Sequence, residues 1–194
     1  MNSTITISNR DLFEVENARN LNVEEVARTF VPTQAFWTLM SSKHHIILGA
    51  RGSGKTALAK MLSHEHLAIL DDNRAKDVIS DASYIGIYVP MKLEWVSGLK
   101  NKPWSTDSEK EELFQWRLNI ASCLSLLATL SSCLRTYFPE EKERVLTEYN
   151  LASKLGADWM GIGEGRITTL SQLESRIRRK EYTRQQELAR TRAM

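Results

Sequence analysis

Gly49-Ala50-Arg51-Gly52-Ser53-Gly54-Lys55-Thr56 matches every fixed position of the pattern G-x-x-x-x-G-K-[ST]. The residues before it, 44–48, are typical of a short buried strand, and residues 57–62 after it are typical of the start of a helix. In this strand–loop–helix context the pattern indicates a phosphate-binding loop. The alternative is a glycine-rich turn between a strand and a helix that ends in Lys-Thr by chance.

Each residue type in the loop has a chemical reason to be there. Glycines let the backbone curl so that successive N–H groups face an anion, and the following helix adds its positive end. Lys55 is expected to contact the β- and γ-phosphates, and the Thr56 hydroxyl is the expected Mg²⁺ ligand. The expected cofactors are therefore ATP and Mg²⁺. The residues expected to hold the phosphates are Gly49, Ala50, Arg51, Gly52, Ser53, Gly54, Lys55 and Thr56.

Length and composition are those of an ordinary globular protein. The chain has 194 residues, of which 42% are hydrophobic and 26% charged, and its formal net charge is +2. These values allow one domain with a real core, or a domain plus an appendage. The N-terminus lacks the pattern of a secretory signal, so a cytoplasmic location is expected. Cys123 and Cys133 are expected to be buried free thiols.

The pattern along the chain predicts an α/β fold of the P-loop NTPase, AAA+-like class. Residues 44–48 and 84–90 are the predicted strands of a partial parallel sheet, and helices are expected to follow residues 22 and 33 and over about 57–66. An all-helical region comes next, with helices near 108–138, 140–155 and 169–192. The predicted domains are an N-terminal arm (1–20), a nucleotide-binding core (21–107) and a helical region with a basic last helix (108–194).

One stretch of the long helix, residues 118–134, carries no charge. Its length touches the lower limit for a membrane span. Four serines, Thr129 and Asn119 lie within it, and no second stretch of this kind follows. A buried helix of a soluble protein is therefore favoured, and no membrane association is expected.

A catalytic carboxylate is harder to find than the loop. Nucleotide hydrolysis needs an acid at the end of an apolar strand, and Leu67-Ala68-Ile69-Leu70-Asp71-Asp72 is the only literal match. It starts about eleven residues after Thr56, which leaves no room for a crossover to an adjacent parallel strand. A helix end followed by a polar turn is the favoured interpretation. Whether the chain is an active ATPase stays open at this point.

The last predicted helix carries a basic cluster. Two interpretations are open: a contact patch for nucleic-acid phosphates, or a solvated helix in which glutamates alternate with the basic side chains. Glu174, Glu181 and Glu187 favour the second. The candidate nucleic-acid contacts are Arg176, Arg178, Arg179, Lys180 and Arg184.

The residues before the loop carry a family resemblance. Residues 17–32, which end in Thr-Phe-Val-Pro, lead through Phe36 and Leu39 into residues 45–56. This stretch resembles the opening of bacterial ATPases related to the origin-recognition-complex branch of the AAA+ class, over roughly residues 17–120. The resemblance implies that Phe30, Val31 and Pro32 contact the adenine. Such ATPases continue through an acidic strand end, a sensor strand and a helical lid, so a truncated product, a fragment or one piece of a split protein is expected.

These observations lead to two hypotheses of different kinds. The first is an ATP-binding AAA+ module that acts as a nucleotide-dependent switch or regulator in a bacterial complex, for which the resemblance suggests genome defence. Hydrolysis would then need acids from missing sequence or from a partner, and a protein partner or a homo-oligomer is expected. The alternative is a non-catalytic scaffold, or a module that binds protein or nucleic acid on the same fold.

Overall fold

The computed structural model describes residues 22–41, 43–91, 95, 106–161 and 165–190. The chain divides into two compact units, Met1–Gly86 and Ile87–Met194. Throughout the described ranges, the regular elements are all α-helices. The boundaries of the nucleotide-binding core and of the arm remain predictions.

The predicted partial parallel sheet is wrong for the part of the chain that the structure describes. Residues 44–48 and 84–90 have no regular secondary structure and form no ladder with each other there. Ile46 and Leu48, expected inside a sheet, are 86% and 87% exposed. A strand is stable only when neighbouring strands satisfy its backbone N–H and C=O groups. The apolar pattern of a segment does not supply those neighbours.

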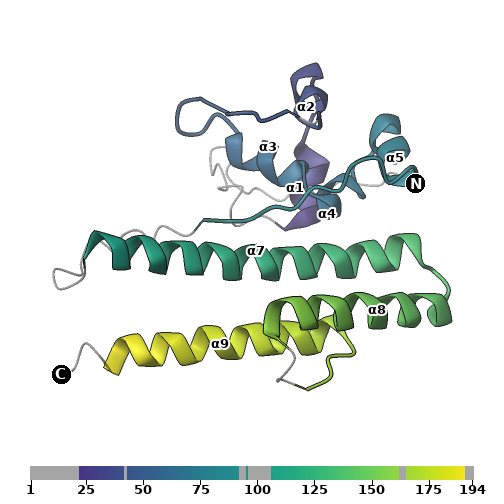
Figure 1. Cartoon of the computed structure of the whole chain (residues 1–194). Coiled ribbons are helices and arrows are strands. Elements are labelled where there is room, and N and C mark those ends of the chain that lie inside the picture. The colour runs from purple at the N-terminus through teal and green to yellow at the C-terminus, as the bar shows by residue number, and fades with distance from the viewer. Residues whose placement is uncertain (1–21, 42, 92–94, 96–105, 162–164, 191–194) are drawn as a thin grey trace, which may run out of the picture. The chain divides into compact units, whose positions relative to one another are not determined.

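The described residues of the first unit form short helices, labelled α1 to α5 in Figure 1. They are α1 (Val23–Thr29), α2 (Gln34–Thr38), α3 (Lys55–Met61), α4 (His64–Leu67) and α5 (Asn73–Ser80). At α1, the Glu25 N–H donates to Asn22 Oδ1 at 2.8 Å, and the Asn22 N–H donates to Glu25 Oε2 at 3.0 Å. Thr33 Oγ1 accepts from the Phe36 N–H at the start of α2. Both predicted helix starts are confirmed, because caps depend on residues only a few positions apart.

The segment around Asp72 is the helix end and polar turn that the spacing favoured. α4 ends at Leu67, and Asp72 is the N-cap of α5, where its side chain accepts from the N–H groups of Arg74 and Ala75. α5 has no counterpart among the helices predicted from the sequence. Its start signal is nevertheless an ordinary Asp N-cap.

An aromatic cluster forms the centre of the first unit's core. Phe36 is fully buried, and its ring meets those of Phe30 and Trp37 edge-on at centroid distances of 4.9 Å. Arg74 of α5 lies over the Trp37 ring at 4.7 Å and covers the outer side of the cluster. The other buried members of this core are Val26, Ala27, Met61, Leu67, Leu70 and Ala75.

Gly86 is a point of close backbone approach in this unit. Its carbonyl accepts from the His64 N–H at 2.9 Å, and a Cβ atom built on Gly86 would overlap the Leu62 carbonyl oxygen. Backbone atoms yield much less easily than the end of a side chain. Gly86→Ala should therefore lower the free energy of unfolding of the first unit by about 1–3 kcal/mol.

The measurement is the urea midpoint of Gly86→Ala, with Ser80→Ala as the control. Ser80 is an exposed residue of the same unit, so its replacement should leave the midpoint nearly unchanged. A Gly86→Ala protein as stable as the wild type would contradict the close approach.

In the described part of the second unit the long helices are α7 (Asp107–Tyr137), α8 (Glu141–Met160) and α9 (Leu170–Arg190). α7 lies beside both α8 and α9, and α9 begins next to the C-terminal half of α8 (Figure 1). The predicted all-helical region is confirmed, although α8 runs five residues beyond the predicted end at Leu155. The core of this unit consists of Leu127, Leu134, Ala152, Ile167, Leu170, Leu173 and Ile177.

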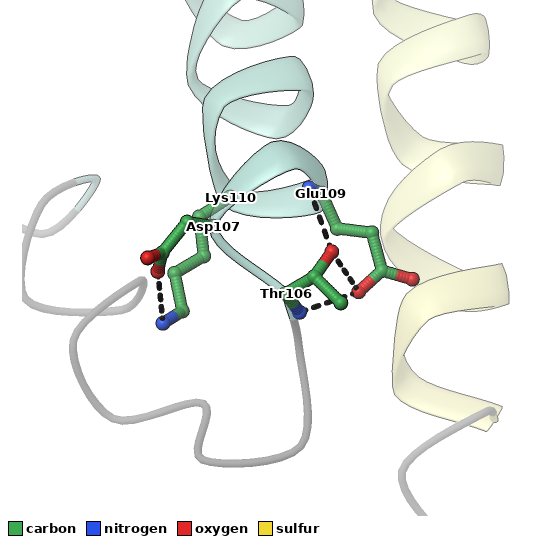
Figure 2. A network of polar contacts seen from close by, with 4 residues as sticks. All are labelled: Thr106, Asp107, Glu109 and Lys110. Atoms are coloured by element: carbon green, nitrogen blue, oxygen red, sulfur yellow. Dashed lines mark hydrogen bonds and ion pairs between the residues drawn. The ribbon is translucent and has the colours of Figure 1, made fainter.

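A capping box sets the start of α7, as Figure 2 shows. The Thr106 N–H donates to Glu109 Oε2 at 2.7 Å, and the Glu109 N–H donates to Thr106 Oγ1 at 3.3 Å. Lys110 and Asp107 form an exposed ion pair at 3.1 Å beside it. The cap satisfies amides that the first helical turn leaves without partners.

α8 also supplies the groups that hold the start of α9. The Leu170 N–H donates to Glu148 Oε1 at 3.0 Å, and the Ser153 hydroxyl donates to the Ile167 carbonyl at 3.0 Å. Leu170, Leu173 and Ile177 of α9 are all buried in this joint.

α7 is long and apolar enough to cross a membrane by length and composition alone. This is weak evidence, because the core helix of a soluble protein passes the same test. Leu127 and Leu134 of α7 are buried in the helical core. Cys123 and Cys133 are free thiols, half-buried and buried, and burial raises the pKa of both.

Candidate functional site

The phosphate-loop residues lead directly into α3. Gly52 and Gly54 have φ values of 85° and 77°, in the left-handed region, and Gly54 is the N-cap of the helix. A Cβ atom at either position would meet no atom within 4 Å, so the reason for glycine here is the backbone conformation and not crowding. The loop therefore has the sharp local turns that its glycine spacing predicts.

Lys55, the first residue of α3, reaches back over the loop. Its Nζ donates to the carbonyl oxygens of Gly49 at 2.8 Å and Ala50 at 2.6 Å, and it lies 3.4 Å from Ser53 Oγ. The Ser53 N–H donates to the same Ala50 carbonyl at 3.3 Å. The ammonium group is thus bonded to the loop that precedes it.

Thr56 follows in the first turn of α3 and is half-buried. The first amide groups of a helix have no intrahelical acceptor, and in α3 these belong to Lys55, Thr56 and Ala57. An ammonium, a hydroxyl and free backbone amides form a donor set that suits a polyphosphate with Mg²⁺. Across the ranges that the structure describes, no group of three His, Cys, Asp or Glu side chains could hold a metal by itself.

The three residues expected at the adenine have different surroundings. The Phe30 ring packs edge-on against Phe36, Pro32 is half-buried, and Val31 is 78% exposed. Phe30 is therefore part of the hydrophobic core as well as a candidate base contact. The role of all three in binding a base remains a prediction.

Comparison with known proteins identifies the family. The ORC-CDC6-like family profile matches residues 11–192, which is nearly the whole chain. The chain belongs to the ORC-CDC6-like family. The origin-recognition-complex resemblance over roughly residues 17–120 is confirmed, and the family match also covers the residues from there to 192. A search of curated proteins and a search of solved structures gave no significant match.

Membership in the ORC-CDC6-like family makes this chain an AAA+ ATPase-related module. Proteins of this family generally bind ATP with Mg²⁺ and assemble into oligomers. The candidate acids of the chain are nevertheless engaged elsewhere. Asp71 pairs with Lys76 at 2.8 Å, and this hydrogen bond lowers the pKa of Asp71, while Asp72 caps α5. Neither residue is presented as an acid at the end of a strand.

Two buried histidines of this ORC-CDC6-like chain are not among the site residues that the sequence predicts. His64 is fully buried and His66 is 7% exposed, both in α4, which packs against α1 and α3. The Ser63 hydroxyl lies 2.8 Å from His66 Nδ1. Burial is the main cause that lowers the pKa of each histidine. The charge of Glu65 acts in the opposite direction on His64. For His66, the charge of Lys60 lowers the pKa further and that of Glu24 raises it. The sequence feature that could have pointed to their burial is their i, i+2 spacing next to the apolar Leu67.

These pKa shifts predict that the first unit loses stability in mild acid. The unfolded histidines titrate near their ordinary value of 6.5, and the folded ones titrate lower, so the unfolded state binds more protons as the pH falls through 6.5. The contribution of the neutral, buried histidines to the free energy of unfolding is complete above the pKa of the unfolded state. It is lost as the pH falls below that value. The urea midpoint should therefore decrease as the pH is lowered from about 7.5 to 5.

The control is the double variant His64→Gln/His66→Gln, whose midpoint should vary less over the same pH range. A wild-type midpoint that stays constant from pH 7.5 to pH 5 would rule out the titration of these two side chains. So would an identical pH profile for the double variant.

Two of the five basic residues of the α9 cluster pair with glutamates of the same helix, and a third bonds to a residue that precedes the helix. Arg178 pairs with Glu174 at 2.7 Å and Arg184 with Glu187 at 3.4 Å, and Arg176 donates to the Gly165 carbonyl at 3.4 Å. These exposed i, i+3 and i, i+4 pairs are those of a solvated helix. Nucleic-acid binding by this helix remains a prediction, and the geometry gives it no further support.

Proposed function

We propose that this chain is an ATP-binding AAA+ module in which residues 49–56 hold the phosphates. The observation that carries the proposal is the loop itself, with left-handed Gly52 and Gly54 and with the Lys55 ammonium held at its centre. Membership in the ORC-CDC6-like family supports it. Lys55 would neutralise the β- and γ-phosphates, and Thr56 would hold Mg²⁺ by its hydroxyl.

We further propose that ATP acts here as a switch and is not turned over by this chain alone. Asp71 pairs with Lys76, Asp72 caps the start of α5, and neither follows a strand. Hydrolysis would need carboxylates from other residues or from a partner protein. Binding energy alone can shift a module between two states if ATP favours one of them. A regulatory role in a bacterial complex, including genome defence, is consistent with this proposal.

The test is a titration of the full chain with a fluorescent ATP analogue, with and without Mg²⁺, followed by a phosphate-release assay. Saturable binding without turnover is the expected result. Absence of saturable binding at millimolar nucleotide would overturn the proposed function, and sustained turnover by the isolated chain would overturn the switch.

Thr56 gives a sharper version of this test. Thr56→Ala should remove most of the affinity that Mg²⁺ adds, about tenfold, while affinity measured in EDTA stays nearly the same. Thr56→Ser keeps the hydroxyl and should keep the Mg²⁺ effect. If Thr56→Ala retains the full Mg²⁺ effect, its hydroxyl is not the metal ligand.

A further inference from the structure

We propose that residues 44–48 form a docking segment for a partner protein, which binds through an extended stretch of alternating aliphatic residues with acidic residues at its ends. The observation is the exposure of aliphatic side chains directly before the phosphate loop. Ile46 and Leu48 are the most exposed large hydrophobic side chains in the described part of the chain, and Ile47 between them is half-buried. The docking segment adjoins the loop, but binding of the partner does not require nucleotide.

The backbone of the docking segment is also available for bonding. Among the described residues, none donates to or accepts from an N–H or C=O group of residues 44–48. The contact of the His45 side chain, whose Nε2 lies 2.9 Å from Ser41 Oγ, leaves the backbone unused. A partner strand forms main-chain hydrogen bonds with such a segment. Residues 44–48 form no strand by themselves, so the pairing would be made only in the complex.

Pairing would bring the two exposed side chains together. Alternate residues of an extended segment point to opposite sides, so Ile46 and Leu48 would share one face. A partner that covers them must offer aliphatic side chains at the same two-residue spacing. Removal of apolar area from water is the dominant favourable term in most protein association. The partner segment is therefore expected to alternate aliphatic residues with residues that face away.

The charges around the docking segment favour an acidic partner. Residues 26–64 contain five Lys and Arg and no Asp or Glu. Lys43, directly before the segment, and Arg51, shortly after it, are both exposed. Opposite charges steer two proteins together, and like charges at an interface weaken binding. A second copy of the docking segment would bring like charges. A nucleic-acid strand would meet the cations but leave Ile46 and Leu48 without apolar contacts.

The experiment measures the fluorescence anisotropy of a labelled synthetic peptide as the full chain is added, without nucleotide. The peptide is Glu-Glu-Val-Ser-Ile-Ser-Val-Glu-Glu, and saturable binding is expected. A control peptide with Lys in place of every Glu should bind at least about tenfold more weakly. A second control with Pro in place of both Ser residues loses main-chain donors and should not saturate. Equal binding of the three peptides would overturn the proposal, and so would an acidic peptide that does not bind.

Two matched variants of the chain locate the binding. Ile46→Ser/Leu48→Ser removes the aliphatic side chains without a change of charge and should weaken binding at least about tenfold. Val145→Ser/Leu146→Ser makes a similar change at exposed residues of α8 and should leave the affinity unchanged. Both variants should keep the wild-type circular dichroism, because exposed residues contribute little to stability. Equal affinities of the two variants would contradict the docking segment.

Two further measurements test the binding mode and the occupant. Hydrogen–deuterium exchange at the amides of residues 45–48 should slow when the acidic peptide is added, because main-chain pairing protects them. Unchanged exchange at saturating peptide would place the peptide elsewhere and overturn the proposal. Sedimentation of the wild type tests for a second copy. A dimer that Ile46→Ser/Leu48→Ser converts to a monomer would assign the segment to self-association and overturn the acidic partner.

Discussion

Affinity for a fluorescent ATP analogue is expected to fall by about 10- to 100-fold when Lys55 is replaced by Ala. The variant loses a charged donor to the phosphates, and hydrogen bonds to charged groups contribute about 1.5–3 kcal/mol.

The matched control is Lys43→Ala, which makes the same change of charge a few residues before the loop. Its affinity should remain within about twofold of the wild type, because an exposed charge outside a site contributes little. Equal affinity of Lys55→Ala and the wild type would show that nucleotide, if bound, is held elsewhere. Isothermal titration of both variants at one salt concentration makes the comparison direct.

The largest effect on stability is expected from Phe36→Ala. Phe36 is fully buried between Phe30 and Trp37, and truncation of a buried Phe typically costs about 3–5 kcal/mol. Native proteins have only about 5–15 kcal/mol of stability in total, so the first unit should be largely or wholly unfolded in mild urea. The second unit has a separate core around Leu127 and Leu173, and it should retain its helical circular dichroism.

Trp37 fluorescence, in a background in which the other four tryptophans are replaced by Phe, and helical circular dichroism measure the two effects in the same urea titration. Val31→Ala is the control, because Val31 is 78% exposed and its truncation should shift the midpoint very little. Phe36→Leu keeps an apolar side chain at this position, so its urea midpoint should lie between those of Phe36→Ala and Val31→Ala. If Phe36→Ala matches Val31→Ala, the aromatic cluster is not the centre of this core.

The structure bears out the predictions that depended on nearby residues. Asn22 and Glu25 define the start of α1, Thr33 that of α2, and Pro139 follows the end of α7. The loop was also recognisable, because its glycines and Lys55 lie within one short motif. Phe30 and Phe36 were both noticed in the sequence, but their edge-on contact was not, since a ring's partner depends on how α1 and α2 pack.

The sequence alone determined the phosphate-loop motif, the family resemblance and the three long helices of the second unit. Each of these is encoded locally, by caps, by 3.6-residue periodicity or by a motif within eight positions. Only the tertiary structure decided that residues 44–48 and 84–90 form no sheet with each other, that His64 and His66 are buried, and that Lys55 bonds to its own loop. The physical reason is that pairing and burial depend on which distant segments meet, and a residue's own neighbours in sequence do not specify them.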